Sequence, residues 1–383
     1  MEIGYALNTL YFLMSAVLVM WMAAGFTMLE AGSVRSKNVT EILIKNVALY
    51  SVASLTFLLG GYELMYGGWS APEDHALMSD FFFQVVFVAT AMSVVSGAVA
   101  ERKKLWSFLA FAVVFTAVIY PIQGSWSWGG GWLSEAGFFD FAGSGIVHMA
   151  GAAAALAAVL LIGPRKGKYV NGVAQPIHGS SSTQVALGTL ILWMGWFGFN
   201  GGSQLSILGL DNANAVAQIF VNTNTAAAAG LLSAMVYSKL WLKKTILNVT
   251  LNGALAGLVV ITADPLTPSP EIALLYGAIG GLIVPISMSL LEKCGIDDPV
   301  GAISVHGIAG IVGLMLVPIL NTGATFEGQL IGTGAILGFV FVSSLFVWYL
   351  LKLTIGLRVG EEEELAGSDM WETGSSAYPD FMK

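Results

Sequence analysis

Residues 140–163 read DFAGSGIVHMAGAAAALAAVLLIG, a run without Lys or Arg whose single acidic residue, Asp140, stands at its start. A helix needs about 20 consecutive, mostly apolar residues to cross the hydrocarbon of a bilayer. This run meets that requirement, and the whole chain is built in the same way, since 56% of its 383 residues are hydrophobic and 10% are charged. A soluble domain carries roughly a quarter charged residues. The sequence therefore predicts an all-α integral membrane protein.

Runs of this kind recur along the chain and predict eleven transmembrane helices. They lie at about 6–31, 42–66, 81–100, 105–124, 142–163, 184–203, 213–242, 246–264, 271–292, 300–320 and 329–355. The first run is interpreted as a true membrane helix, because residues 1–30 lack the basic start of a secretory signal. We expect a transmembrane domain over 1–355 and a polar, acidic cytoplasmic tail over 356–383.

The basic residues predict how these helices are oriented. All 16 Lys and Arg residues fall near odd-numbered loops, at the end of the last helix or in the tail, and the even-numbered loops and the N-terminus have none. Because basic residues prefer the cytoplasmic side, we expect the N-terminus outside and the C-terminus inside the cell's inner (plasma) membrane. A wrong number of helices would have placed basic residues in both odd- and even-numbered loops. The alternation therefore also favours a multi-pass protein with eleven membrane spans.

Two short stretches match each other and predict an internal repeat. Asp140 stands eight residues before His148, Asp298 stands eight residues before His306, and a valine precedes each histidine. The stretches begin the fifth and tenth predicted helices, so the two copies would cross the membrane in opposite directions. Inverted repeats place a substrate path near the membrane midplane. We expect repeats over about 6–163 and 184–320, followed by an eleventh helix over about 329–355.

The two histidines inside predicted helices are candidate functional residues. A lone histidine in a helix is more often a hydrogen-bonded packing residue, but His148 and His306 occupy matching positions of two opposed copies. Imidazole can donate from one nitrogen and accept at the other, so a facing pair could pass a proton or bind a small polar solute. No third ligand stands at helical spacing, so we expect no metal site. No cofactor is expected either.

Aromatic residues line up on two of the predicted helices. Trp196, Phe199 and Ser203 are spaced by three and four residues and so share a helix face, and Phe83 and Phe87 lie one turn apart. Aromatic rows more often pack than line a path. Here a hydroxyl, an Asn and several glycines at the end of the sixth predicted helix favour a binding role.

Tryptophans also gather in the fourth loop, where Trp126, Trp128 and Trp132 surround three consecutive glycines. Some of them are expected to form an interfacial aromatic belt. An indole face is also the best side-chain binder of a cation. The even-numbered loops carry no Lys or Arg that would repel one.

Taken in order, these residues resemble the ammonium transporter family, in its bacterial Amt-type branch, over nearly the whole chain. The resemblance rests on the following stretches: Ala31-Gly-Ser-Val-Arg-Ser-Lys-Asn38, Ala100-Glu-Arg102, Trp128-Gly-Gly-Gly131, Asp140-Phe-Ala-Gly-Ser144, Gly195-Trp-Phe-Gly-Phe-Asn200, Val221-Asn-Thr-Asn-Thr225, Gly253-Ala-Leu-Ala-Gly257, Asp297-Asp-Pro-Val300 and Val305-His-Gly307. Each stretch is weakly specific alone, and their order and spacing are highly specific.

The resemblance implies an outer recruitment site for ammonium. Trp128 matches an indole that contacts the cation, Ser203 matches a hydroxyl that accepts a hydrogen bond from it, and Phe83 matches an aromatic lining residue. Asp140 matches an acid that supports this site by orienting its neighbours.

Below that site the resemblance implies a gate and a narrow apolar pore. Phe87 and Phe199 match the stacked gate, His148 and His306 match the twin histidines of the pore, and Trp196 matches its wall. The implied function is an electrogenic ammonium transporter, not an enzyme, which strips NH4+ at the mouth and conducts NH3. A neutral-gas channel of the Rh branch is disfavoured by Trp128.

The resemblance implies a homotrimer in the lipid bilayer with no nucleic-acid partner. The alternative function is an ammonium sensor, but such proteins usually append a kinase or cyclase domain, and this chain ends at Lys383 without one. Many relatives carry a His-Gly-Glu in the tail, where this chain has Thr373-Gly374-Ser375. That departure weighs against a P-II-type regulator as a further partner. Glu361 to Glu364 are expected to be a solvated charge run.

Overall fold

The computed structural model describes residues 2–381 and is built almost entirely of helices. The α-helices are α1 (Glu2–Ser33), α2 (Val39–Thr56), α3 (Tyr62–Tyr66), α4 (Leu77–Ala98), α5 (Leu105–Val114), α6 (Tyr120–Ser125), α7 (Trp132–Glu135), α8 (Ala150–Ile162), α9 (Ser182–Gly202), α10 (Gly209–Trp241), α11 (Leu247–Thr262), α12 (Pro270–Lys293), α13 (Ala309–Leu320), α14 (Phe326–Thr354) and α15 (Glu361–Ala366). Short π-helical turns join several of them: η2 (Phe57–Gly61), η3 (Phe115–Ile119), η4 (Ser144–Met149), η5 (Ile303–Ile308) and η6 (Asp369–Thr373). Single 3-10 turns, η1 (Ser36–Asn38) and η7 (Pro379–Phe381), complete the set.

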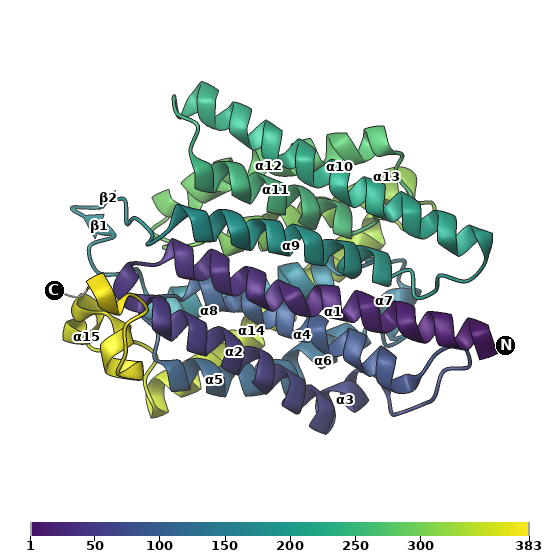
Figure 1. Cartoon of the computed structure of the whole chain (residues 1–383), viewed down its shortest axis with the longest axis horizontal. Helices are drawn as coiled ribbons and strands as arrows, with labels where there is room; N and C mark the ends of the chain where they lie inside the picture. The colour runs from purple at the N-terminus through teal and green to yellow at the C-terminus, as the bar shows by residue number, and fades with distance from the viewer. Residues whose placement is uncertain (1, 382–383) are drawn as a thin grey trace.

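The long helices lie side by side in one elongated bundle, with the two termini at opposite ends (Figure 1). Within residues 2–381, nine helical segments are long and apolar enough to cross a membrane, and α11 is a shorter apolar helix. The predicted all-α fold is therefore confirmed. Each of the eleven predicted runs is helical, including the run at α9, but eleven as the number of membrane spans stays a prediction.

The closest packing brings together helices that lie far apart in the sequence. Helix α1 runs along α9 in the middle of the bundle (Figure 1). Gly188 allows this approach, because a Cβ at that position would stand 2.4 Å from the backbone nitrogen of Leu29 and 2.6 Å from the carbonyl oxygen of Gly25. Small residues at helix interfaces let membrane helices pack backbone to backbone. The contact joins the first and second predicted repeats along most of the length of α1.

A buried network of ion pairs ties the loops together at the end of the bundle that carries the C-terminus. Arg165 donates to both carboxylate oxygens of Asp297 at 2.9 Å, and its guanidinium also lies 3.6 Å from Glu101. Arg35 pairs with Glu101 from another loop at 2.6 Å. Burial alone would raise the pKa of Asp297, but the hydrogen bonds and charge of Arg165 lower it to about 2. The charged residues that predicted an orientation therefore also fasten the two repeats to each other.

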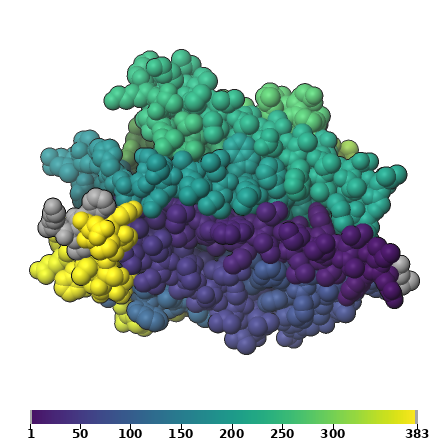
Figure 2. Space-filling view, viewed as in Figure 1, coloured from purple at the N-terminus to yellow at the C-terminus, as the bar shows by residue number. Residues whose placement is uncertain are grey.

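Two features of this end differ from expectation. The loop after α8 carries a small hairpin, in which β1 (Tyr169–Val170) pairs antiparallel with β2 (Val173–Ala174), and no strand was predicted there. The acidic run of the tail is only partly solvated, because Glu364 is buried and forms an ion pair of 2.8 Å with Arg358. The expectation of a fully solvated run was wrong because the tail folds back as a cap on the bundle (Figure 2). Asp369 holds that cap in place by accepting a hydrogen bond from the backbone N–H of Glu41.

Candidate functional site

His148 lies in a π-helical turn whose first N–H groups are capped by an aspartate. The carboxylate of Asp140 accepts hydrogen bonds from four successive backbone N–H groups, those of residues 143–146, at 2.8–3.1 Å. These donors have no partner within the helix at its N-terminus, and a side-chain acceptor satisfies them. Gly143 makes the sharp entry possible with a φ of +110°, a region that residues with a side chain rarely adopt. The turn η4 then carries His148 into the core, where it is fully buried.

His306 lies in a similar π-helical turn in the second predicted repeat, and an aspartate again accepts hydrogen bonds from the backbone around the start of that turn. Asp298 accepts hydrogen bonds from the backbone N–H groups of Val300, Gly301 and Ile303 at 2.7–3.3 Å. The π-helical turn η5 follows and carries His306, which is 4% exposed. Single π-helical turns inside α-helices occur frequently at functional sites. The matched spacing of Asp and His in the sequence thus corresponds to a matched local geometry.

The two imidazoles meet inside the bundle. Their Nδ1 atoms lie 3.2 Å apart and the ring centroids are 5.1 Å apart, with an angle of 27° between the planes. At this distance one Nδ1 can donate a hydrogen bond to the other, and the tautomers of the two rings decide which nitrogen holds the proton. Within the described chain, the Nε2 of His148 has no hydrogen-bond partner. The pair is therefore a buried polar contact with aromatic rings on both sides, Phe199 and Trp196 beside His148 and Phe26 beside His306.

A line of aromatic rings leads from the histidines toward the end of the bundle where the N-terminus lies. The ring of Phe199 is 5.2 Å from that of His148, and Phe87 stacks on Phe199 with 4.2 Å between centroids. Phe83 follows 4.8 Å beyond Phe87, and Trp128 lies 5.9 Å from Phe87. Phe83, Phe87 and Phe199 are buried. The predicted gate residues therefore close the space between the histidines and Trp128.

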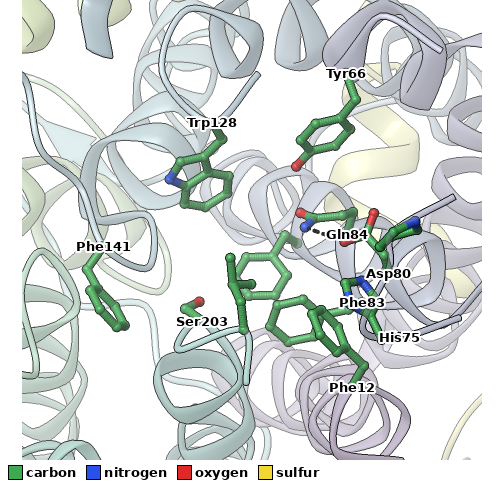
Figure 3. A pocket seen from close by; sticks show the side chains of 12 residues that line it. Phe12, Tyr66, His75, Asp80, Phe83, Gln84, Trp128, Phe141 and Ser203 are labelled. Atoms are coloured by element: carbon green, nitrogen blue, oxygen red, sulfur yellow. Dashed lines mark hydrogen bonds between the residues drawn. The ribbon is translucent and has the colours of Figure 1, made fainter. Parts of the chain in front are cut away.

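Beyond these rings lies a pocket of about 330 Å³. We call it the large pocket, to distinguish it from the smaller cavities near the histidines, although a pocket of about 470 Å³ under the C-terminal tail is bigger. Figure 3 shows Trp128 and Ser203 on one side of it and Asp80 with Gln84 on the other. Of the four residues predicted for recruitment, Trp128, Ser203 and Phe83 line the pocket. Asp140 does not, but its backbone carbonyl accepts a 2.9 Å hydrogen bond from the indole nitrogen of Trp128. The Asp140 loop thereby fixes the orientation of the indole.

Trp196 lies beside the histidine pair and is held by a chain of polar side chains behind it. Its ring is 5.0 Å from that of His148, and its indole nitrogen donates to the hydroxyl of Thr262 at 2.7 Å. Thr262 donates to Asn200 at 3.1 Å, and Asn200 donates to Thr223 at 3.0 Å. All four residues are buried. This network fixes the wall opposite the histidines.

Several residues of the large pocket were not identified from the sequence. Asp80 accepts hydrogen bonds from Gln84, at 3.1 Å, and from the hydroxyl of Tyr62, and the ring of His75 stacks on Phe12 at 4.2 Å. His75 was assigned to a loop without a role, and Thr262 was not considered. Asp80 could have been noticed as a carboxylate at the start of the third predicted helix. His75 reaches this pocket, and Thr262 reaches Trp196 outside it, only through helix packing, which leaves no local signal in the sequence.

Comparisons with known proteins find relatives over nearly the whole chain. The model of the Ammonium Transporter Family matches residues 10–378. The chain is similar to ammonium transporter Amt2 of Archaeoglobus fulgidus, with 41% identity over 97% of this chain and 88% of the relative. It is 32% identical to an ammonium transporter of Bacillus subtilis, over 98% of this chain and 99% of the relative. Among solved structures, a "Sensor Amt Protein" superimposes with a TM-score of 0.93 at 34% identity, over 97% of this chain and 99% of the other.

Proposed function

Because the chain belongs to the ammonium transporter family, we propose that it is an electrogenic transporter that recruits NH4+ in the large pocket and conducts NH3 past the histidine pair. The observation that carries the proposal is the continuous row of rings from Trp128 through Phe87 and Phe199 to His148 and His306. It joins a cation-binding indole to a buried hydrogen-bonding pair. The protein is a multi-pass membrane protein.

We place the protein in the inner (plasma) membrane of the cell, where its chain crosses the bilayer eleven times. The N-terminus then lies outside the cell and the C-terminus lies in the cytoplasm. Two inverted repeats with an additional helix α14 account for the odd number. The matched Asp–His turns and the position of the termini at opposite ends of the bundle support it (Figure 1). The large pocket then faces the outside, and the basic loops face the cytoplasm, as basic residues prefer.

The physical reason for deprotonation is the apolar interior between pocket and histidines. An unpaired ion moved into such an interior costs on the order of tens of kcal/mol, and the buried rings of Phe87 and Phe199 offer no compensating oxygen. NH4+ therefore gives up its proton to a relay that runs through the histidine pair, and NH3 crosses the gate. Because NH3 and the proton recombine to NH4+ on the other side, one positive charge crosses for each ammonium, which makes the transport electrogenic.

The outer site in this proposal combines two kinds of contact. The face of Trp128 attracts the cation, and the hydroxyl of Ser203 accepts one of its hydrogen bonds, while Phe83 completes the wall. Asp140 acts through Trp128 and the backbone of η4 without touching the ion. Potassium can use the aromatic face but cannot donate hydrogen bonds to serine or histidine, which favours ammonium.

The proposed assembly is a homotrimer with one pore in each subunit, as the family resemblance implies. A P-II-type regulator is disfavoured, because the tail departs from the family pattern at Thr373 and Ser375.

A second candidate function is ammonium sensing with little flux. It is favoured by one specific observation, the superposition on a solved structure whose name describes a sensor. The two functions share the large pocket and the rings, so geometry alone supports both, and transport rate separates them.

The experiment that tests the proposal is flux through purified protein in liposomes. Labelled methylammonium uptake and ammonium-evoked current are recorded from the same preparation, with potassium as the control ion. We expect uptake and current that exceed those of protein-free liposomes, and no potassium current. Correctly folded protein that binds ammonium but gives no flux above the protein-free control would favour the sensor and contradict the proposal.

A further inference from the structure

A second cavity lies on the other side of the histidine pair, toward the C-terminal end of the bundle. We call it the inner cavity, and it is lined by residues that include Phe26, Glu30, Ser93, Asn252 and His306. It leaves about 20 Å³ for the centre of a water-sized molecule, which is enough for about one such molecule. The ring of Phe26 stands 6.0 Å from that of His306. The row of rings thus continues through the histidines to this cavity.

Glu30 contributes the one carboxylate among the residues that line the inner cavity. It lies one helical turn beyond Phe26 on the same face of α1, and it is fully buried. Its Oε2 atom is the acceptor for Ser96 at 2.8 Å, Lys45 at 3.0 Å and Asn46 at 3.2 Å. Its Oε1 atom has no hydrogen-bond partner within residues 2–381. A buried acceptor left without a donor is costly, and this one belongs to a residue of the cavity wall.

Lys45 sets the strength of this site. Both members of the Glu30–Lys45 pair are almost fully buried, with side chains 1% and 0% exposed. A buried carboxylate without a counter-ion would hold a monovalent cation tightly, and a site on a transport path must also release its ion. The neighbouring ammonium group of Lys45 weakens the field of the carboxylate while leaving Oε1 free as an acceptor. The pair therefore suits weak binding of a small N–H donor.

A further cavity lies next to the inner cavity, toward the C-terminal end of the bundle. The two cavities share three wall residues, Leu29, Asn252 and Val300. This further cavity is also lined by Ser33, the last residue of α1, and by Pro299 in the loop before η5. A molecule at Glu30 is thus one cavity away from the loops that carry the basic residues.

From these contacts we infer that Glu30, backed by Lys45, forms a weak binding site for one ammonium ion at the inner end of the path. The inference rests on the proposed function and adds a second ion site to it, on the opposite side of the histidines from Trp128. The Oε1 atom accepts a hydrogen bond from the ion, and the ring of His306 lies across the same cavity. Ammonium that enters or leaves by the cytoplasmic side occupies this site.

The test measures transport separately from each side of oriented liposomes, sorted through a tag on the C-terminus. Glu30→Gln keeps the size of the side chain and removes its charge. Because this change leaves Lys45 buried without its partner, the double variant Glu30→Gln/Lys45→Met is measured in parallel. The matched control is Glu41→Gln/Lys103→Met, which neutralises another buried Glu–Lys pair that does not line the inner cavity.

We expect the Glu30 variants to raise the half-saturating ammonium concentration at least fivefold when ammonium is supplied from the C-terminal side. The value from the N-terminal side should stay within twofold, as should both values in the control, and Glu30→Asp should recover part of the loss. Two results would contradict the inferred site: half-saturating concentrations that rise equally from both sides, or a folded Glu30→Gln/Lys45→Met variant whose values do not change from either side. If the wild type itself shows no flux, the proposed function fails. That result differs from a wild type that transports ammonium and Glu30 variants with an unchanged half-saturating concentration, which would exclude the Glu30 site alone.

Discussion

The two Asp–His turns share one pattern of backbone hydrogen bonds but lie in different surroundings. Asp140 and Asp298 each gather the free N–H groups at the start of a π-helical turn, and each turn delivers a histidine to the same contact. On the Asp140 side the loop before the turn reaches the large pocket, because Phe141 lines that pocket and Trp128 is hydrogen-bonded to the loop itself. On the Asp298 side it faces the small inner cavity and stands next to Asp297, which pairs with Arg165.

The difference shows which properties are symmetric in this molecule. The position of the histidines depends on local spacing and is the same in both copies. The character of each entrance depends on the neighbouring loops, which are aromatic and free of basic residues at one end and rich in ion pairs at the other. In the proposed function, the symmetric turns position the two histidines, and the different surroundings of the two turns determine how an ion approaches from each end.

The largest expected effect comes from removing the aspartate of the first turn. Asp140→Ala leaves four buried N–H groups without their acceptor, and each unsatisfied buried group costs about 1–3 kcal/mol. We expect a loss of about 3 kcal/mol or more in the free energy of unfolding, measured by thermal denaturation of purified protein. Asp298→Ala, which frees three such groups, should lose less. A smaller loss in the free energy of unfolding for Asp140→Ala than for Asp298→Ala would contradict this account of the two turns.

The next effect concerns the ion pair beside the second turn. The folded pKa of Asp297 is about 2, below the ordinary 3.8, so ionisation of this group stabilises the folded state. The contribution is fully present above pH 3.8 and is lost as the pH falls through about 2. Asp297→Asn should therefore lower stability by about 2 kcal/mol at neutral pH. In unfolding curves taken across this range, a difference that stays constant down to pH 2 would contradict the assigned pairing.

A more moderate effect is expected at the large pocket. Trp128→Leu removes the indole face, and a cation–π contact is worth about 0.5–2 kcal/mol. The half-saturating ammonium concentration should rise by about fivefold in liposome uptake, while the thermal stability stays close to that of the wild type. Trp126→Leu, in the same loop but not lining the pocket, provides the control. An unchanged concentration dependence for Trp128→Leu would remove this residue from the recruitment site.

The smallest expected effect lies in the polar network behind the path. Thr262→Val keeps the shape of the side chain but removes the hydroxyl that accepts from Trp196. The change also removes the hydrogen bond from Thr262 to Asn200, but only the bond from Trp196 holds a residue beside the histidines. Because that bond contributes about 0.5–1.5 kcal/mol, we expect the maximal transport rate to fall by about twofold with an unchanged half-saturating concentration. Loss of potassium exclusion in this variant would mean that Trp196 helps to select the ion.

The sequence was informative wherever the signal was local. Helix lengths, the basic loops and the eight-residue spacing of Asp and His all depend on neighbours along the chain, and the structure has a helix at every predicted run. The contact between His148 and His306, the role of Thr262 and the place of His75 depend on helices that meet across long separations. Glu30 was visible as a charge inside a predicted helix, but its partner Lys45 and its cavity appear only after packing.

The most direct measurement is the current carried by His148→Ala in liposomes, in ammonium and in potassium, with the wild type alongside. If the histidine pair relays the proton, this variant should lose its ammonium current, because His306 has no facing nitrogen left. A pore that becomes wider and wetter would instead pass potassium together with ammonium. An ammonium current as large as that of the wild type, with potassium still excluded, would contradict the relay and leave the histidines as pore lining.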